Sequence, residues 1–141
     1  LTGVFNLELA RLYHYLFQKT DQNFTVLYAL EGYDEISLTG PTKAFSNHRE
    51  QILTPADFGV KPVRPDEISG GENVVSSAEI FMNVIQNKGT KAQTNVICAN
   101  AGMAIATALQ STPKDGFEKA KESLLSGKAF EALKNLQKLS K

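Results

Sequence analysis

The 141-residue chain contains one cysteine and carries no net charge. A single cysteine, Cys98, excludes an internal disulfide and a zinc site built from several thiolates. Because 15 basic side chains balance 15 acidic ones, the chain lacks the basic excess of modules that bind duplex nucleic acid. The longest mostly apolar run, Val96 to Leu109, has 14 residues, whereas a membrane span needs roughly 20. With no basic-then-apolar start either, we expect a cytoplasmic protein without a nucleic-acid or membrane partner.

Several common catalytic signatures are also missing. The sequence has no serine nucleophile elbow, no Walker phosphate loop and no dinucleotide-binding fingerprint. The two histidines, His14 and His48, have no Cys, His or carboxylate at metal-ligand spacing, so we interpret both as structural or solvated. Cys98 sits in an apolar run, which favours a small buried side chain over a reactive thiol. These residue types therefore supply no catalytic candidate.

What the chain does contain is typical of one folded α/β domain. Its length suits a single domain, and 42% of its residues are hydrophobic. The first half mixes an amphipathic helix with short β-branched and aromatic runs, and the second half shows helical periodicity throughout. We predict strands near 24–30, 36–39, 42–45 and 51–53, and helices near 7–18, 73–86, 94–109, 113–125 and 128–139.

The composition of three helices predicts how they pack. Small residues dominate 94–109, so we expect it to be the central buried helix, with Ala104 in close contact with a neighbour. The other two helices carry apolar stripes of the kind that faces a core. These are Phe5, Leu9, Leu12 and Leu16 at the first helix, and Phe130, Leu133, Leu136 and Leu139, expected to point inward, at the last.

Two positions could bind a ligand. Asp34 and Glu35 follow a hydrophobic strand and Gly32, which is where open α/β sheets place ligand sites. Two neighbouring carboxylates suit Mg²⁺, provided that the chain bends there so that both face one ion. On spacing alone, a solvated acidic turn is the favoured interpretation. Gly70-Gly71 before a helix could contact a phosphate, although a simple connector is the favoured interpretation.

The segment around the acidic pair has a distinctive sequence. Residues 32–42 read Gly-Tyr-Asp-Glu-Ile-Ser-Leu-Thr-Gly-Pro-Thr, which closely resembles the G-x-D-E-I-S-L-T-G-P-T segment of the anthranilate phosphoribosyltransferase family. Further segments resemble that family in the same order along the chain. They are Gly3-Val4-Phe5 with Glu8-Leu9, Pro55-Ala56-Asp57-Phe58-Gly59, Gly70-Gly71-Glu72-Asn73, Asn100-Ala101-Gly102 and Ser126-Gly127-Lys128-Ala129.

The resemblance implies a transferase of tryptophan biosynthesis. Such enzymes join anthranilate to phosphoribosyl pyrophosphate (PRPP) and release pyrophosphate, usually as homodimers. Asp34 and Glu35 match the acidic pair that binds Mg²⁺ at the pyrophosphate. The implied fold is the C-terminal part of the large α/β domain of the nucleoside phosphorylase-like phosphoribosyltransferases, with a helix-rich second half.

The chain departs from the family pattern by what it omits. The G-T-G-G-D loop that cradles PRPP phosphates, the K-H-G-N motif and the anthranilate-binding residues are absent, and in the family they precede the point matched by Leu1. With a start other than Met, we expect residues 1–141 to be a C-terminal fragment, a partial catalytic α/β domain that is inactive alone. Alternatives are a related pyrimidine nucleoside phosphorylase and a non-catalytic nucleic-acid-binding relative.

Overall fold

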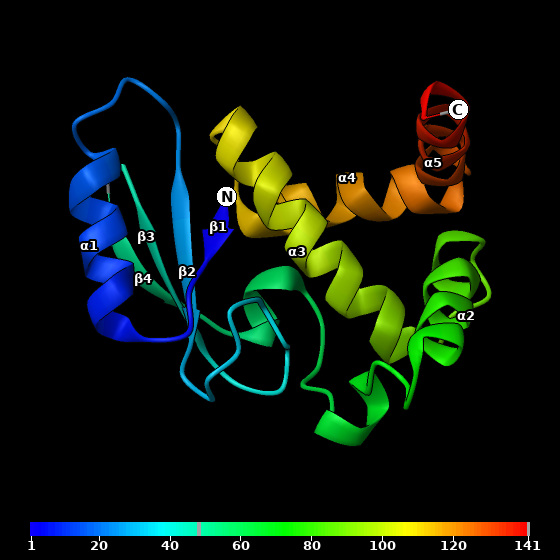
Figure 1. Cartoon of the computed structure of the whole chain (residues 1–141). Helices are drawn as coiled ribbons and strands as arrows, with labels where there is room; N and C mark the ends of the chain where they lie inside the picture. Colours follow the sequence, from blue (N-terminus) through cyan, green and yellow to red (C-terminus); the bar gives the residue numbers. More distant parts are fainter. Residues whose placement is uncertain (48, 141) are drawn as a thin grey trace.

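The structure is a computed structural model that describes residues 1–47 and 49–140, and it has a small sheet followed by a helical half (Figure 1). The strands are β1 (Thr2–Gly3), β2 (Thr25–Ala29), β3 (Thr42–Ser46) and β4 (Glu50–Leu53). Two short 3₁₀ helices, η1 (Pro55–Phe58) and η2 (Pro65–Ile68), follow the sheet. The α-helices are α1 (Leu7–Phe17), α2 (Val74–Ile85), α3 (Lys91–Leu109), α4 (Pro113–Leu125) and α5 (Lys128–Leu139). The predicted α/β class is confirmed.

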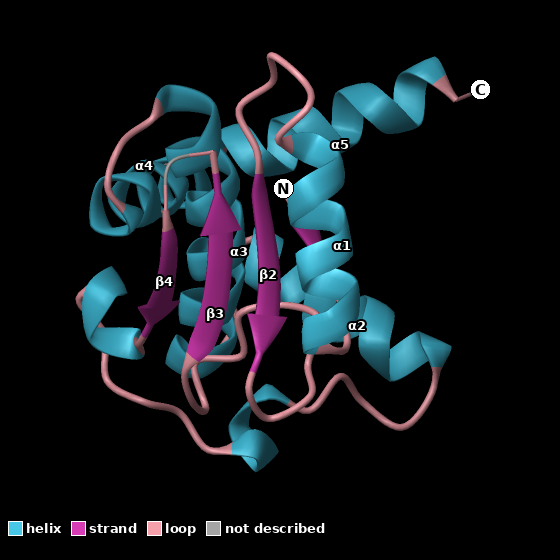
Figure 2. Cartoon of the chain, turned by 90° about the vertical axis from the view of Figure 1, so that its left-hand side faces the viewer, coloured by secondary structure: helices cyan, strands magenta, loops and turns pink. Residues whose placement is uncertain are grey.

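The sheet is mixed and covered on both faces. Its strands lie in the order β1-β2-β3-β4, with β1 parallel to β2 and the other neighbours antiparallel (Figure 2). Val26 pairs with Phe45, and both pack in the cluster under α1, whereas Leu27 and its partner Ala44 pack in the cluster shared with α3 and α4. Successive residues of β2 are buried because each face has its own helical cover, which explains why the strand does not alternate apolar and polar residues.

One predicted strand is wrong. Residues 36–39 form a loop, although Ile36, Ser37 and Leu38 are all buried. Leu38 has a left-handed φ of 60°, and its carbonyl oxygen accepts a hydrogen bond from the Val63 N–H at 3.0 Å. The segment is buried by side-chain contacts with the core, but its backbone turns too sharply to continue a strand. The hairpin predicted from the runs on either side of 46–49 is confirmed.

The helix ends follow side-chain caps. The Asn6 carboxamide oxygen accepts from the Leu9 N–H at 2.8 Å and starts α1 where the sequence predicts. Helix α3 begins at Lys91, three residues before the predicted start, because Thr90 and Gln93 form a reciprocal capping box. Across the described residues, the structure shows no helix that combines the length and apolarity needed to cross a membrane.

Among the described residues, α3 and α4 are the most extensively packed pair of elements. At their crossing, a Cβ on Gly102 would lie 2.6 Å from both the Cα and the backbone nitrogen of Phe117. Gly116 faces the Gly102 backbone with equally little room for a side chain. The two backbones can approach this closely only because neither position carries a side chain.

The small residues of α3 do not all face this contact. Ala99, Gly102 and Ala106 are buried, but Ala104 is exposed, so the prediction that Ala104 packs against a neighbour is wrong. Small residues run around the whole of α3, and a composition rich in alanine therefore does not indicate which face is covered.

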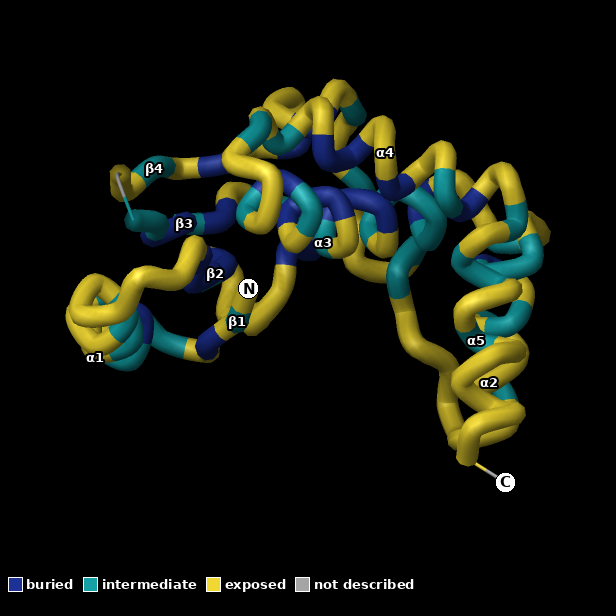
Figure 3. The backbone as a smooth tube through the Cα atoms, turned by 90° about the horizontal axis from the view of Figure 1, so that it is seen from above, coloured by how far each residue is buried: buried dark blue, intermediate teal, exposed yellow. Residues whose placement is uncertain are grey.

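The apolar stripes of α1 and α5 are also largely exposed. Leu136 and Leu139 are 64% and 86% exposed, which corrects the expectation that they point inward. Only the first turn of α5 reaches the core, through Ala129, and the helix then projects from the body on the same side as α2 (Figure 3). In α1, Leu12 and Leu16 are exposed. The side of the helix that packs on the sheet is formed by Leu9, Ala10, Tyr13 and Phe17.

Replacement of Gly102 by alanine should destabilise the fold. The added methyl group overlaps the α4 backbone, so we expect G102A to lower the free energy of unfolding by about 1–3 kcal/mol, despite the better helix propensity of alanine. Urea unfolding monitored by circular dichroism measures this change. The matched variant A104L adds a larger side chain to the same helix on its exposed face, and it should change stability by less than about 0.5 kcal/mol. Equal effects of the two variants would contradict the close crossing.

Candidate functional site

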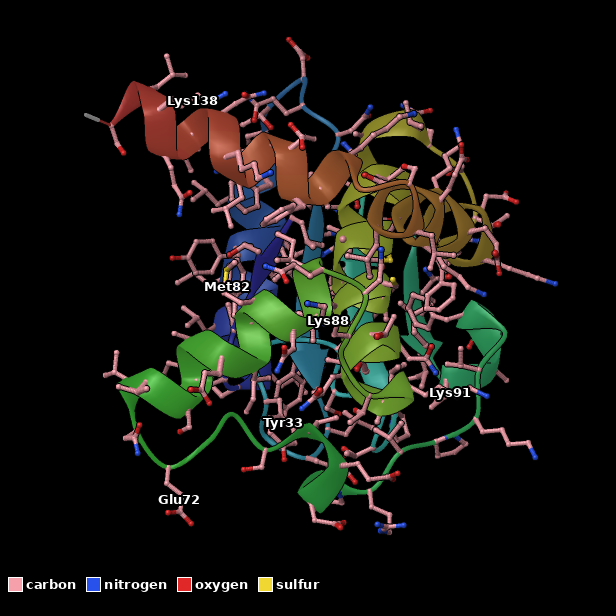
Figure 4. The ribbon with its side chains drawn as sticks, turned by 90° about the vertical axis from the view of Figure 1, so that its right-hand side faces the viewer. Tyr33, Glu72, Met82, Lys88, Lys91 and Lys138 are labelled. Carbon is pink, nitrogen blue, oxygen red and sulfur yellow. The ribbon has the colours of Figure 1, made fainter. Side chains whose placement is uncertain are left out.

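The acidic pair lies at the carboxyl end of the two parallel strands. Because β1 and β2 run in the same direction, Gly3 and Ala29 end them at the same edge of the sheet. The connection 30–41 leaves β2 at that edge and returns to β3 (Figure 1). Tyr33, which precedes Asp34, lies just beyond the end of β2 (Figure 4). This is the position at which open α/β sheets bind ligands.

The connection starts with a turn that backbone hydrogen bonds hold in place. The Gly32 N–H donates to the Ala29 carbonyl oxygen at 3.0 Å, and the Ala29 N–H donates to the Tyr33 carbonyl oxygen at 3.1 Å. Gly32 has a φ of 92°, a conformation that residues with a Cβ rarely adopt. The bend expected at Gly32 is therefore present, and it fixes the backbone up to the residue before Asp34.

The backbone of Asp34 rests against β1. A Cβ on Gly3 would overlap the Asp34 carbonyl oxygen and lie 2.6 Å from its carbonyl carbon. Only glycine at position 3 lets the acidic segment approach the end of β1 this closely. The Gly-Val-Phe sequence at the start of the chain thus has a packing role beside the acidic pair.

Asn100 of α3 holds the other side of the segment. Its Oδ1 accepts from the Ile36 N–H at 3.0 Å, and its Nδ2 donates to the Ile36 carbonyl oxygen at 2.8 Å. A second Nδ2 hydrogen bond, to the Val96 carbonyl oxygen at 3.0 Å, fixes the rotamer. Sequence reasoning placed Asn100 only in a family-like motif and missed this role. The signal was present, because Asn100 is the one amide in the apolar run from Val96 to Leu109.

The carboxylates of Asp34 and Glu35 are exposed, and within the described ranges neither belongs to an ion pair. A second Asp-Glu pair, Asp66-Glu67, differs in this respect. Asp66 accepts two hydrogen bonds from the Arg64 guanidinium, at 3.0 and 2.9 Å, and these lower the pKa of the Asp66 carboxyl. The Asp34-Glu35 pair keeps its oxygens available for a ligand.

This donor set fits Mg²⁺ better than a metal that needs a full protein cage. In residues 1–47 and 49–140, no three or more His, Cys, Asp or Glu side chains gather closely enough to hold a metal ion. Two carboxylates leave most of an octahedral site to water and phosphate oxygens, which is the usual arrangement for Mg²⁺ at a phosphate substrate. The hard oxygen donors and the rigid turn that carries them are compatible with that ion.

The other sequence candidates have structural roles. His14 Nε2 lies 3.1 Å from the Ser46 carbonyl oxygen, and the ring packs between Phe24 and Phe45. Cys98 is buried, and burial raises the pKa of its thiol, as an inert core side chain requires. His48 lies outside the described residues.

The Gly70-Gly71 step is an exposed connector into α2, whose N-terminus is capped by Asn73. Figure 4 shows the next residue, Glu72, pointing away from the body of the molecule. Neither observation indicates a ligand at these glycines.

Comparison with known proteins identifies the fold and the family. Residues 1–130 match the family described as the glycosyl transferase family, a/b domain. The chain belongs to this glycosyl transferase family. The anthranilate phosphoribosyltransferase of Christiangramia forsetii is 61% identical over 140 residues, which cover 99% of this chain and 42% of that protein. The resemblance inferred from the residues is thereby confirmed, and the chain spans less than half the length of the curated relatives it matches.

Solved structures of anthranilate phosphoribosyltransferases share the fold. Anthranilate phosphoribosyltransferase from Thermus thermophilus superposes with a TM-score of 0.83 at 23% identity, over 94% of this chain and 40% of that one. The enzyme from Saccharomyces cerevisiae in complex with PRPP and Mg gives a TM-score of 0.80 at 22% identity, over 94% and 38% of the two chains.

A methyl group at position 3 should displace the acidic segment. We expect G3A to lower the free energy of unfolding by about 1–3 kcal/mol, because the Asp34 carbonyl must move or β1 must detach. Hydrogen exchange of the Ile36 amide, which donates to Asn100, should accelerate in parallel. The control is G70A, since a Cβ at Gly70 meets nothing within 4 Å. If G3A matches G70A in both measurements, the result would contradict the close contact between β1 and the acidic segment.

Proposed function

We propose that these 141 residues act within an anthranilate phosphoribosyltransferase, which transfers the phosphoribosyl group of PRPP to the anthranilate amine and releases pyrophosphate. In this proposal they form part of the catalytic α/β domain. Asp34 and Glu35 hold the Mg²⁺ ion at the pyrophosphate. The enzyme works in the cytoplasm as a homodimer.

The observation that carries the proposal is the position of the acidic pair. Asp34 and Glu35 lie exposed at the carboxyl end of the parallel strands, on a turn held by Gly3, Gly32 and Asn100. The relatives at about 60% identity are named for this activity, and the yeast enzyme with the same fold was solved with PRPP and Mg. These findings support a phosphate ligand with a divalent cation at this edge.

In this proposal the described residues contribute two negatively charged side chains at a fixed position. When bound, Mg²⁺ neutralises negative charge that develops on the departing pyrophosphate. Asp34 and Glu35 supply two hard oxygen ligands from adjacent residues, and the turn keeps them at the strand ends where the diphosphate is expected. Attack comes from the anthranilate amine itself, so no nucleophile from these residues is required. Catalysis then depends on positioning the two substrates.

Removal of the acidic pair should abolish magnesium-dependent transfer. In a full-length enzyme that contains these residues, D34N combined with E35Q should lower turnover at limiting Mg²⁺ by at least about a hundredfold. Both positions are exposed, so the melting temperature should stay within a few degrees of the parent. Anthranilate fluorescence measures the reaction. The matched control is D66N with E67Q, which changes the Asp-Glu pair already engaged by Arg64 and should retain activity.

Near-parental turnover of the D34N and E35Q variant would refute the metal assignment. Activity with phosphate and a pyrimidine nucleoside, in place of PRPP and anthranilate, would instead identify a phosphorylase. The first outcome is measured on the variant and the second on the parent enzyme.

The 141-residue chain alone should not catalyse the transfer. It lacks the G-T-G-G-D loop with which the family cradles PRPP phosphates, and it lacks the K-H-G-N motif. Two carboxylates by themselves bind Mg²⁺ weakly. Calorimetry with Mg²⁺ and PRPP should show no binding of PRPP at millimolar concentration, and the fluorescence of anthranilate should stay constant. Robust turnover by the purified chain would show that the missing motifs are dispensable.

A further inference from the structure

We propose that Asn100 is a positioning residue for the acidic pair. Its side chain fixes the backbone of Ile36, and through it the place at which the Asp34 and Glu35 carboxylates stand at the end of β2. The inference rests on the proposed function of that pair, since positioning matters only if the carboxylates bind a ligand.

The first observation is that Asn100 engages both backbone groups of one residue. Oδ1 accepts from the Ile36 N–H at 3.0 Å and Nδ2 donates to the Ile36 carbonyl oxygen at 2.8 Å, across 64 positions of sequence. With the bond from Nδ2 to the Val96 carbonyl oxygen at 3.0 Å, both amide hydrogens are used. A flipped carboxamide would place oxygen against oxygen. The side chain therefore has one productive orientation.

The second observation is where this clamp lies along the chain. The Tyr33 carbonyl oxygen is held by the Ala29 N–H at 3.1 Å, and Ile36 is held by Asn100. Only Asp34 and Glu35 lie between these two anchors. A span of two residues fixed at both ends has little freedom, so the carboxylates are presented from a pre-organised backbone.

The third observation is that the clamp joins the site to the core. Ile36 is 2% exposed, and α3 is locked against α4 by the crossing at Gly102, two residues after Asn100. The position of the acidic pair is thus set by a helix that the rest of the domain holds in place. Groups that orient metal ligands in this way typically affect metal affinity or activity by about 10- to 100-fold when they are replaced.

The test compares N100A and N100D with two controls in a full-length enzyme that contains these residues. N100D has the same shape as asparagine but puts an oxygen where Nδ2 donates, so its effect cannot be attributed to a cavity. N95A removes an amide from the same helix at a position that lines a different cavity, beside Lys61 and Lys121. V84A removes buried side-chain volume from α2 and lowers stability, and among the described residues α2 makes no hydrogen bond to residues 33–36.

Two readouts separate positioning from general stability. The Mg²⁺ concentration for half-maximal activity should rise about tenfold or more in N100A and N100D, while the KM for anthranilate changes less than about twofold. Hydrogen exchange of the Ile36 amide should accelerate at least about tenfold in N100A, because the Oδ1 atom that accepts its hydrogen bond is removed. N95A should match the parent in both, and V84A should lower the melting temperature without changing the Mg²⁺ dependence.

The proposal is overturned if N100A resembles V84A, with reduced stability and an unchanged Mg²⁺ dependence. If the parent enzyme shows no magnesium-dependent transfer, the proposed function fails, and the exchange rates then decide the role of Asn100 by themselves. Faster exchange of the Ile36 amide in N100A but not in N95A would support the clamp, and equal rates in the two variants would refute it.

Discussion

The crossing of α3 and α4 at Gly102 and Gly116 is the contact on which the rest of this structure depends. Two helices can meet backbone to backbone only where side chains are absent, so the crossing fixes their register as well as their distance. Because α3 is held in this register, Asn100 faces the loop after β2 and its carboxamide meets the Ile36 backbone. A packing constraint in the helical half therefore determines the geometry of an acidic segment in the sheet half.

The sheet determines the edge at which the acidic segment lies. Two parallel strands bring Gly3 and the start of the 30–41 connection to one edge, and the lack of a side chain at Gly3 lets the Asp34 backbone lie against β1. Strand β2 is buried from both sides, which makes it a rigid base for the turn that follows it. The acidic pair is thus exposed on a support that is itself buried, an arrangement suited to binding a charged ligand without reorganisation.

The helical half leaves apolar surface exposed to solvent. Helices α2 and α5 project from the core, and much of their apolar surface is open in this chain (Figure 3). Amphipathic periodicity reports that a helix has an apolar face, but not what covers that face. This is why the periodicity of 128–139 located α5 correctly while the inward orientation of Leu136 and Leu139 was wrong.

Much of this molecule could be read from local sequence, because local physics decides it. Side-chain caps such as Asn6 mark helix boundaries, and the segment around Asp34 and Glu35 predicted the family to which the chain belongs. Tertiary structure alone decided which small residues of α3 are buried, why residues 36–39 form a loop instead of a strand, and what Asn100 does. Each of these depends on contacts between residues far apart in the sequence, where hydrogen-bond partners and close backbone approaches are set by the packing of whole elements and leave no local pattern.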